Sequence, residues 1–283
     1  MTRSVVVTGA NSGIGLATTL LLAKSGFDVI GTVRSTAKAD VLVGAAEAEQ
    51  VVVRTVLCDV TDRAATVAAF AEISALTAGG PWAVVNNAGY AQAGAIEDVD
   101  DEHVLRQLET NLVAPARVAR LVLPAMRARG EGRIVNISSV AGRVSLPVLG
   151  WYCASKRGLE AMTDALRMEV APFGVRVSLV EPGSFGTGIW GEADYPKDPA
   201  TPEYATAYAR GAGGTNAASR FMPDPIWVAR TVRLALTSPV PLARYLVGVD
   251  AVGGTIAERV LPTFISDRVK AITAGLARLP FQR

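Results

Sequence analysis

A tyrosine and a lysine, Tyr152 and Lys156, stand four positions apart in the second half of the chain. Residues with this spacing project from one face of a helix, so both side chains can reach a single cleft. A free phenol has a pKa of about 10 and a fixed ammonium stabilises the phenolate, so we expect Lys156 to lower the pKa of Tyr152 by about two to three pH units. Tyr152 can then exchange a proton with an alcohol or carbonyl oxygen. Taken alone, the spacing is more typical of an aromatic residue and a lysine on an amphipathic helix.

A glycine-rich segment near the N-terminus, Thr8 to Gly15, follows an apolar run and opens a predicted helix. Three residues separate Gly9 from Gly13, and one separates Gly13 from Gly15. The N–H groups of such a turn and the helix N-terminus attract an anion such as a pyrophosphate, and glycine lets the phosphate approach the backbone. A turn that only connects a strand to a helix is the alternative interpretation.

The composition is that of a folded globular protein that binds a small molecule. Half of the 283 residues are hydrophobic and 19% are charged, which excludes a disordered chain. Lysine and arginine together number 28 against 26 acidic residues, and no basic run occurs, so nothing indicates a nucleic-acid or anionic-membrane surface. The N-terminus does not resemble a secretory signal, and glycine and polar residues interrupt the uncharged stretch 4–23. We therefore expect a cytoplasmic protein without a membrane span.

Cysteine and histidine are too scarce for several kinds of site. Cys58 and Cys153 are too few for a disulfide scaffold or a zinc site, and His103 alone cannot hold a metal, so we expect catalysis without a metal. His103 follows three acidic residues, where a solvated helix start is a better explanation than a catalytic base, and this argues against Ser-His-Asp hydrolysis. On a helix, Cys153 projects about 100° away from Tyr152 and is expected to pack in the interior.

Short apolar runs rich in β-branched residues recur along the chain, and each interval between them has room for a helix. This pattern predicts repeated βαβ units, and thus a single doubly wound α/β domain over residues 1–283 with a seven-stranded parallel sheet and helices on both faces. Two long predicted helical stretches, 101–129 and 151–172, could also form a subunit interface. The predicted strands are Ser4–Thr8, Val29–Val33, Val51–Leu57, Trp82–Asn86, Arg133–Ser138, Val175–Glu181 and Arg244–Gly248.

The segment 183–225 differs from the rest of the chain because it is rich in glycine, proline and aromatic residues. We predict a long loop without regular structure that closes over the substrate as a mobile, largely apolar lid. The substrate is then expected to be lipophilic and bulky, as a steroid, a retinoid or an aryl ketone is. Alternatively, these aromatic side chains pack on the protein itself or across a subunit interface. Residues 249–283 are expected to form a C-terminal helical extension.

Taken together, these segments resemble the classical short-chain dehydrogenase/reductase family over residues 4 to about 250, and residues 152–156 resemble hydroxysteroid and retinol dehydrogenases. The resemblance implies a Rossmann-type domain, a homodimer or homotetramer, and hydride transfer between a nicotinamide cofactor and a small-molecule carbonyl or alcohol. The implied catalytic residues are Asn111, Ser139, Tyr152 and Lys156. The implied substrate contacts are Ser139, Tyr152, Phe185 and Trp190. The implied cofactor contacts are Gly9, Asn11, Ser12, Gly13, Ile14, Gly15, Arg34, Asp59, Val60, Asn87, Ala88, Gly89, Tyr152, Lys156, Pro182, Gly183 and Thr187.

The same resemblance gives each catalytic residue a role. Tyr152 is the acid/base, Lys156 also holds the nicotinamide ribose, and Ser139 orients the reacting oxygen. Asn111 holds a water that passes protons to Lys156, or merely bends its helix, since asparagine is mildly unfavourable inside one. Pro115 departs from the family pattern, which often has glycine at this position, and could change how the helix continues.

Cofactor choice in this fold is decided at the end of the second strand, about 20 residues beyond the glycine turn. There Val33 offers no acceptor for the ribose hydroxyls of NAD(H), whereas Arg34 can pair with a 2′-phosphate, so we expect NADP(H) to be preferred over NAD(H). An ordinary surface arginine is the alternative. Two other functions fit the sequence less well. A non-catalytic dinucleotide sensor need not retain the four implied catalytic residues, and an epimerase or dehydratase with the same Tyr-Lys pair usually needs a larger substrate domain.

Overall fold

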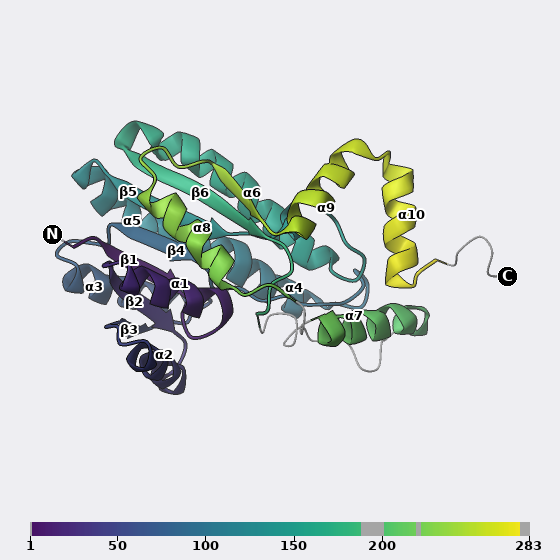
Figure 1. Ribbon diagram of the computed structural model, residues 1–283, viewed down its shortest axis with the longest axis horizontal. Coiled ribbons are helices and arrows are strands. Elements are labelled where there is room, and N and C mark those ends of the chain that lie inside the picture. The colour runs from purple at the N-terminus through teal and green to yellow at the C-terminus, as the bar shows by residue number, and fades with distance from the viewer. Residues whose placement is uncertain (1, 188–200, 219–221, 278–283) are drawn as a thin grey trace.

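The computed structural model describes residues 2–187, 201–218 and 222–277. These residues form an open sheet of seven parallel strands in the order β3-β2-β1-β4-β5-β6-β7 (Figure 1). The predicted doubly wound parallel sheet is confirmed. The strands are β1 (Ser4–Thr8), β2 (Asp28–Val33), β3 (Arg54–Leu57), β4 (Ala83–Asn86), β5 (Gly132–Ile137), β6 (Val175–Pro182) and β7 (Arg244–Val247).

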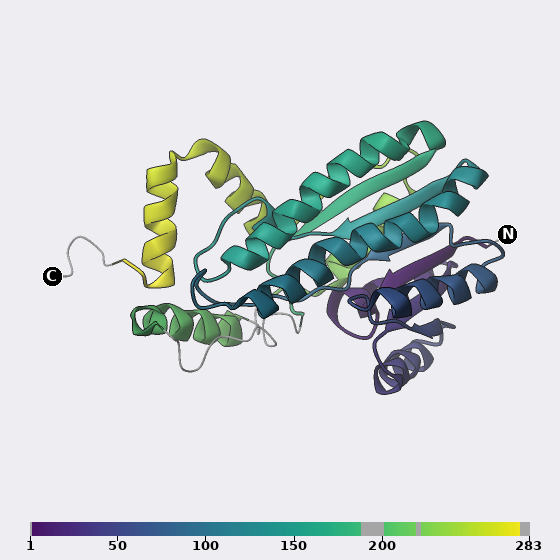
Figure 2. The ribbon, with the colours of Figure 1, turned by 180° about the vertical axis from the view of Figure 1, so that it is seen from behind.

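Helices cover both faces of the sheet, as the two opposite views show (Figure 1, Figure 2). Helices α1, α2 and α8 pack on one face, and α3, α5 and α6 pack on the other. The longer helices are α1 (Gly13–Lys24), α2 (Thr36–Ala48), α3 (Arg63–Leu76), α4 (Asp101–Leu108), α5 (Ala114–Arg129), α6 (Gly150–Val170), α7 (Ala205–Ala218), α8 (Ile226–Thr237), α9 (Val249–Val260) and α10 (Thr263–Ala274). Among the described residues, no helix is both long enough and apolar enough to span a bilayer.

The alternation of side chains along each strand builds the two layers. Val5 and Val7 of β1 pack in the cluster that contains Leu22 of α1, whereas Val6 between them packs in the cluster that contains Phe70 of α3. Successive side chains of a strand point to opposite faces, and helices bury both faces of a parallel sheet. This is why the strands appear in the sequence as continuous apolar runs.

The predicted helical stretch 101–129 is divided by a single π-helical turn, η1 (Glu109–Val113), between α4 and α5. Ala114 donates its N–H to the carbonyl of Glu109, five residues back, in place of the four-residue bond of an α-helix. Pro115 has no N–H, so it cannot supply the α-helical hydrogen bond to the carbonyl of Asn111. Pro115, which departs from the family pattern, thus lies where the helix changes its hydrogen-bond pattern, close to the predicted catalytic residue Asn111.

The prediction of irregular structure throughout 183–225 is wrong for residues 202–218. A 3-10 turn, η5 (Pro202–Tyr204), leads directly into α7. Four alanines at 205, 207, 209 and 212 favour a helix, and α7 tolerates the glycines at 211, 213 and 214. Helices α9 and α10 extend away from the sheet, and α10 reaches α7, where Arg210 donates to the carbonyl of Ile272 at 3.0 Å (Figure 1).

Candidate active site

The candidate active site lies at the carboxyl edge of the sheet, beside the point where strand order reverses between β1 and β4. Three elements deliver the predicted catalytic residues to it. Ser139 follows β5, Tyr152 and Lys156 come from the first half of α6, and Asn111 comes from the π-helical turn. Each of the four residues is at most 5% exposed. Buried polar side chains need hydrogen-bond partners, and each of these four side chains has at least one.

Ser139 and Tyr152 are hydrogen-bonded through their side chains. Ser139 is also the N-cap of the short helix η2 (Val140–Gly142), where its hydroxyl accepts the N–H of Ala141 at 3.2 Å. The ammonium of Lys156 lies 5.8 Å from the centre of the Tyr152 ring and donates to the carbonyl of Ile137 at 3.0 Å. A hydroxyl, a phenol and an ammonium therefore lie close together, as the four-residue spacing predicts for Tyr152 and Lys156.

The pKa values of the phenol and the ammonium correct one expectation. Burial raises the pKa of Tyr152 to about 12, and the hydrogen bond from Ser139 only partly opposes this. The expected lowering by Lys156 is not seen, because desolvation of the phenolate dominates. Burial lowers the pKa of Lys156 to about 8, while the charge of Glu160 acts to raise it. At neutral pH the site thus holds a neutral phenol, suited to donate a proton, beside a charged ammonium.

The side chain of Asn111 is fully engaged with its neighbours. Its amide nitrogen donates to the carbonyl of Tyr90 at 2.9 Å and to the hydroxyl of Ser155 at 3.0 Å. Its amide oxygen accepts the N–H of Tyr90 at 3.2 Å. The side chain therefore ties the π-helical turn to the loop after β4 and to α6. The predicted role of this side chain in holding a water is therefore not supported by a free polar atom of the amide.

The glycine turn after β1 and the segment after β4, which are predicted to form a cradle for a dinucleotide, are hydrogen-bonded to each other. Asn87 donates to the carbonyls of Thr8 and Gly9 at 2.9 and 3.1 Å, and the hydroxyl of Thr8 accepts the N–H of Asn87 and of Ala88, both at 3.0 Å. A Cβ on Gly15 would lie 2.1 Å from the carbonyl oxygen of Gly9, so only glycine fits. Thr8 is not among the predicted site residues, although it stands at the start of the glycine motif.

Other predicted cofactor contacts surround this cradle. A Cβ on Gly13 would lie 3.1 Å from Cβ of Thr187, so the turn after β6 reaches the glycine turn. A Cβ on Gly89 would lie 3.0 Å from the amide oxygen of Asn111 and 3.7 Å from Nζ of Lys156. The cradle and the catalytic side chains therefore belong to one continuous site. The remaining members here are Asn11, Ser12 and Ile14 around the start of α1, and Pro182 and Gly183 at the end of β6.

Arg34 and Asp59 lie at neighbouring strand ends, after β2 and β3. Thr61 donates its N–H and its hydroxyl to one oxygen of Asp59, at 2.9 and 2.7 Å. Burial acts to raise the pKa of Asp59, but the hydrogen bonds from Thr61 and the positive charge of Arg34 prevail and lower it. Arg34 itself is exposed, and Val60 beside Asp59 is buried. The guanidinium is thus available to an anion at the edge where the adenosine ribose of a dinucleotide lies in this fold.

The two predicted aromatic substrate contacts have different outcomes. Phe185 is 3% exposed and packs in the hydrophobic core with Val180 and Val228, which argues against a substrate contact. An aromatic residue after a glycine turn does not reveal from sequence whether it faces the cleft or the core. Trp190 lies outside the described residues.

Sequence reasoning missed a polar clasp between α7 and the loop after β4. Tyr208 is 3% exposed, and its hydroxyl donates to Asp98 at 2.6 Å and accepts the N–H of Ala95 at 2.8 Å. Thr201 donates to the other oxygen of Asp98 at 2.7 Å, and Tyr204 donates to Glu97. This clasp fastens the segment 201–208 to residues 95–98 of the loop after β4.

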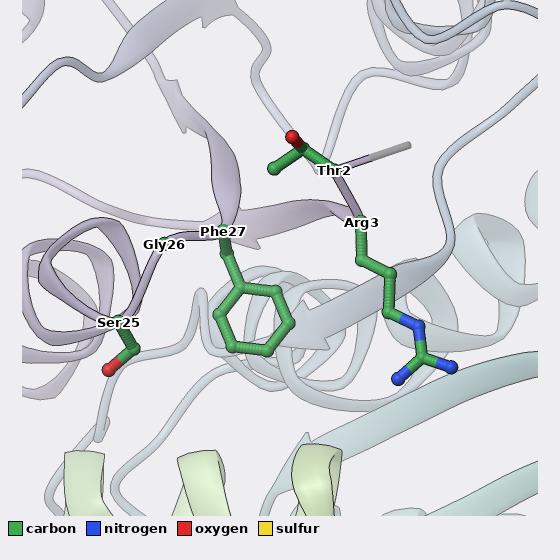
Figure 3. A pocket seen from close by; sticks show the side chains of 5 residues that line it. All are labelled: Thr2, Arg3, Ser25, Gly26 and Phe27. Atoms are coloured by element: carbon green, nitrogen blue, oxygen red, sulfur yellow. The ribbon is translucent and has the colours of Figure 1, made fainter.

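A separate surface depression lies at the opposite edge of the sheet (Figure 3). Its lining residues precede β1 and β2, at the amino ends of the strands, and the Arg3 guanidinium stacks 4.4 Å from the centre of the Trp82 ring. Ligands bind at the carboxyl edge in sheets of this kind, so this depression is not part of the active site. The lining residues are Thr2, Arg3, Ser25, Gly26 and Phe27.

Comparison with known proteins identifies the family to which this site belongs. The family described as short chain dehydrogenase matches residues 3–197, more than half of the chain.

The chain belongs to the short-chain dehydrogenase family.

Similar proteins extend this result over almost the whole chain. An uncharacterized oxidoreductase, YusZ of Bacillus subtilis, is 42% identical over 66% of this chain and 67% of its own. The NADPH-dependent 3-dehydrocapnine reductase of Ornithobacterium rhinotracheale is 32% identical over 94% and 95% of the two chains, and rat retinol dehydrogenase 16 is 31% identical over 94% and 86%. The crystal structure of a short-chain dehydrogenase from Streptomyces avermitilis superposes with a TM-score of 0.78 at 35% identity, covering 96% of this chain and 95% of that one. The predicted resemblance is confirmed, and this short-chain dehydrogenase is an NAD(P)-dependent oxidoreductase.

Proposed function

We propose that the protein transfers hydride between NADP(H) and a lipophilic ketone, aldehyde or alcohol, with Asn111, Ser139, Tyr152 and Lys156 as its catalytic residues. The observation that carries this proposal is the convergence of Ser139, Tyr152 and Lys156 at the carboxyl edge of the sheet, beside a cradle that only glycine can form. When bound, the nicotinamide supplies the hydride for reduction and accepts it in oxidation.

The protein's own side chains would handle the proton and the orientation of the substrate. In reduction, the neutral phenol of Tyr152 donates its proton to the carbonyl oxygen as negative charge develops there. The hydroxyl of Ser139 donates a hydrogen bond to the same oxygen and fixes its position. Lys156 stabilises the resulting phenolate by its charge and holds the ribose hydroxyls. The raised pKa keeps the phenol of Tyr152 protonated at neutral pH, so the proton needed for reduction is present on it.

The preference for NADP(H) rests on Arg34. Its exposed guanidinium lies close enough to Asp59 to lower the pKa of that carboxyl, and it follows Val33, which cannot accept a hydrogen bond from ribose through its side chain. The name of the relative from Ornithobacterium rhinotracheale, an NADPH-dependent reductase, supports the same choice.

The substitution Arg34→Ser is expected to raise the Kd for NADPH by about 10- to 100-fold and to change the Kd for NADH by less than about twofold. The reason is the loss of a charge-assisted pair with the 2′-phosphate, which NADH lacks. Fluorescence titration of both cofactors measures the two constants. Arg176→Ser, at an exposed position near the amino end of β6, is the matched control. An equal loss of affinity for both cofactors would contradict the role of Arg34.

The proposal of a lipophilic substrate rests on two relatives whose names specify retinol and 3-dehydrocapnine, because Phe185 and Tyr208 of the segment 183–225 are buried within the protein itself. A panel of retinoids, steroid ketones, long-chain 3-oxo compounds and short polar ketones, followed by nicotinamide absorbance, tests this proposal. We expect kcat/KM to be at least about tenfold higher for the bulky apolar members, because each buried CH₂ contributes about 0.8 kcal/mol. Turnover of small polar alcohols alone would contradict the proposal.

The clasp at Asp98 is proposed to hold the segment 201–208 as one wall of the substrate cleft. Tyr208→Phe is expected to speed hydrogen exchange in residues 202–210 about tenfold and to raise KM for bulky substrates, because Asp98 and the N–H of Ala95 lose a buried partner. Hydrogen exchange followed by mass spectrometry measures this effect. Tyr204→Phe removes a more exposed hydroxyl from the same segment and should have the smaller effect. Unchanged exchange in Tyr208→Phe would show that the clasp does not order the segment.

A further inference from the structure

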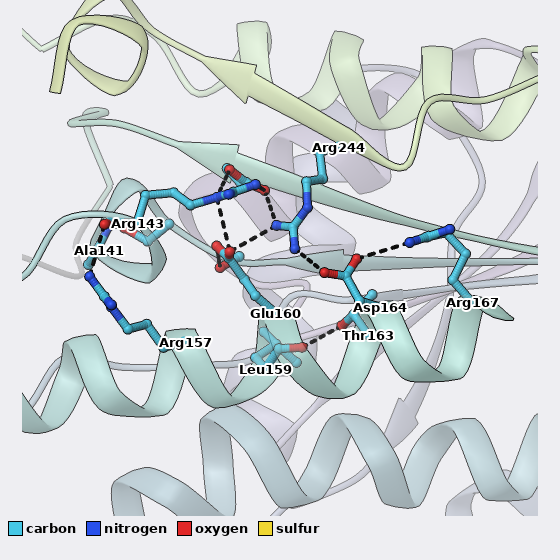
Figure 4. A network of polar contacts seen from close by, with 12 residues as sticks. Ala141, Arg143, Arg157, Leu159, Glu160, Thr163, Asp164, Arg167 and Arg244 are labelled. Carbon is cyan, nitrogen blue, oxygen red and sulfur yellow. Dashed lines mark hydrogen bonds and ion pairs between the residues drawn. The ribbon is translucent and has the colours of Figure 1, made fainter. Parts of the chain in front are cut away.

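A buried carboxylate, Glu160, lies on α6 one helical turn beyond Lys156 (Figure 4). Its side chain is 7% exposed and has partners from three other parts of the chain. The hydroxyl of Ser138 donates to Oε1 at 3.0 Å, Nε of Arg143 lies 3.1 Å from Oε2, and Nη1 of Arg244 donates to Oε2 at 2.8 Å. A buried carboxylate needs hydrogen-bonding or charged partners, and these three partners hold the Glu160 side chain in place.

A second buried carboxylate, Glu181, shares both arginines. Its side chain is fully buried, and it directly precedes Pro182 in β6. Arg143 donates to it through Nε and Nη2 at 3.0 and 3.2 Å, and Nη1 of Arg244 donates at 2.7 Å. Two carboxylates and two guanidinium groups thus join four segments of the chain (Figure 4). Asp164, further along α6, extends the network by pairing with both Arg244 and Arg167.

The loop that carries Ser139 is held on both sides by this network. Ser138 precedes Ser139, and Arg143 follows it after η2. A Cβ on Gly142 would lie 2.1 Å from Oε1 of Glu160, so the loop backbone passes directly over the carboxylate. Because Glu160 and the pair Tyr152 and Lys156 belong to the same rigid helix, contacts between Glu160 and the loop set the position of Ser139 relative to Tyr152.

We propose that Glu160 is a positioning residue for the oxidoreduction: through Ser138 and Arg143 it holds the Ser139 loop against the helix that carries Tyr152 and Lys156, and its negative charge faces Lys156. This inference rests on the proposed function, because it takes Ser139, Tyr152 and Lys156 as the catalytic residues. Glu181, through the shared arginines, extends the same support to the turn at Pro182 and Gly183, which the family resemblance implies as cofactor contacts.

The electrostatic surroundings of Lys156 support the second part of the proposal. Lys156 faces the ring of Tyr152 on its own helix and the carbonyl of Ile137 on β5, and its ammonium lies near Gly89. Burial lowers its pKa, and the charge of Glu160 opposes that effect. Glu160 in turn faces Glu181 on β6, Arg143 after η2, Arg244 on β7 and Asp164 on α6. Burial and Glu181 raise the pKa of Glu160, while Arg143, Ser138 and Arg244 act to lower it.

The test compares Glu160→Gln with Asp164→Asn in the full chain, using NADPH and a ketone found in the substrate panel. Glu160→Gln keeps the shape of the side chain but removes its charge and one acceptor. We expect kcat to fall about 10- to 100-fold and KM for NADPH to stay within about twofold. In the parent, kcat is expected to decline as pH rises through about 8, where Lys156 loses its proton, and in Glu160→Gln this alkaline decline should move about one pH unit lower. Asp164→Asn removes a charge from the same helix and the same Arg244, and it should change neither kcat nor the pH profile by more than about twofold.

Two further variants distinguish the effect of Glu160 on the position of the Ser139 loop from the effect of its charge on Lys156. They also provide a test if Glu160→Gln does not fold. Ser138→Ala breaks one contact and leaves the charge, so kcat should fall about fivefold with the alkaline decline in place. Glu160→Asp retains the charge but is too short to reach both Ser138 and Arg143, so it should also lower kcat without moving the decline. Circular dichroism and NADPH titration establish that each variant is folded.

Parental kcat and an unmoved pH profile in folded Glu160→Gln would overturn the inference, as would equal effects in Glu160→Gln and Asp164→Asn. If Glu160→Gln does not fold, parental kcat in both Ser138→Ala and Glu160→Asp would overturn the inference. These failures are distinct from failure of the proposed function. If Tyr152→Phe is inactive while Glu160→Gln behaves as the parent, only the role of Glu160 is wrong; if Tyr152→Phe is active, the catalytic assignment itself is wrong.

Discussion

Replacing Tyr152 by phenylalanine is expected to lower kcat for carbonyl reduction by about a thousandfold while the Kd for NADPH stays within about twofold. The substitution removes one hydroxyl from a side chain that is 3% exposed and leaves its ring, its helix and the glycine cradle unchanged. Proton transfer by a positioned acid contributes about 100- to 10,000-fold to rate, and the phenol of Tyr152 is a neutral acid hydrogen-bonded to Ser139. Steady-state kinetics and NADPH fluorescence titration give the two quantities.

A matched control comes from a tyrosine on β7. The hydroxyl of Tyr245 accepts the N–H of Leu242 at 2.9 Å, outside the catalytic cleft, so Tyr245→Phe should keep parental kcat. If Tyr152→Phe kept more than about a tenth of the parental kcat, another group would have to supply the proton, and the assignment of Tyr152 as the acid would be abandoned.

The sheet and the position of the site followed from local patterns in the sequence. Apolar β-branched runs predicted each strand, and the carboxyl ends of parallel strands had to meet at one edge, which places Ser139 after β5 near the glycine turn after β1. The i, i+4 spacing on a helix fixed the relation of Tyr152 to Lys156 without knowledge of any other contact. These inferences succeeded because each depends on residues close together in the chain.

The pKa of Tyr152 could not be predicted in this way. The expectation considered the charge of Lys156 alone, whereas the structure shows that burial dominates and raises the pKa to about 12. Desolvation depends on everything packed around the group, which a spacing of four residues does not report. The burial of Phe185 in the core was missed for the same reason.

The polar networks were also beyond local inference. Glu160 and Arg244 are 84 positions apart, and Tyr208 and Asp98 are 110 apart. The residues next to each of these four in the sequence do not indicate which distant residue it pairs with. A weak signal was present for Glu160, which repeats the four-residue interval from Tyr152 to Lys156 once more along α6. A carboxylate on the buried face of a helix needs a cation, and this requirement could have directed attention to Arg143 and Arg244.

Replacing Lys156 by methionine is expected to lower kcat about a hundredfold and to raise the Kd for NADPH about tenfold. The variant loses the charge that stabilises a phenolate at Tyr152 and the donor proposed to hold the ribose hydroxyls. The parental kcat for reduction should fall as pH rises through about 8, where Lys156 loses its proton, and this decline should be absent from the variant. Lys270→Met, which removes a lysine paired with Glu258 outside the site, is the control and should keep the decline.

The same substitution should reveal what the buried ammonium costs in stability. The pKa of Lys156 is about 8 in the folded protein against 10.5 ordinarily, so below pH 8 both states are charged and folding carries the full penalty, about 3 kcal/mol. As pH rises from 8 toward 10.5, the unfolded chain holds the proton that the folded protein has lost, and the parent is stabilised. Methionine also leaves the carbonyl of Ile137 without its donor, but that cost does not vary with pH. Urea denaturation gives the free energy of unfolding of Lys156→Met and of the parent. The value for Lys156→Met minus the value for the parent should decrease by about 2 to 3 kcal/mol between pH 7 and pH 10. A difference that stays constant with pH would show that Lys156 is not buried as a charged group.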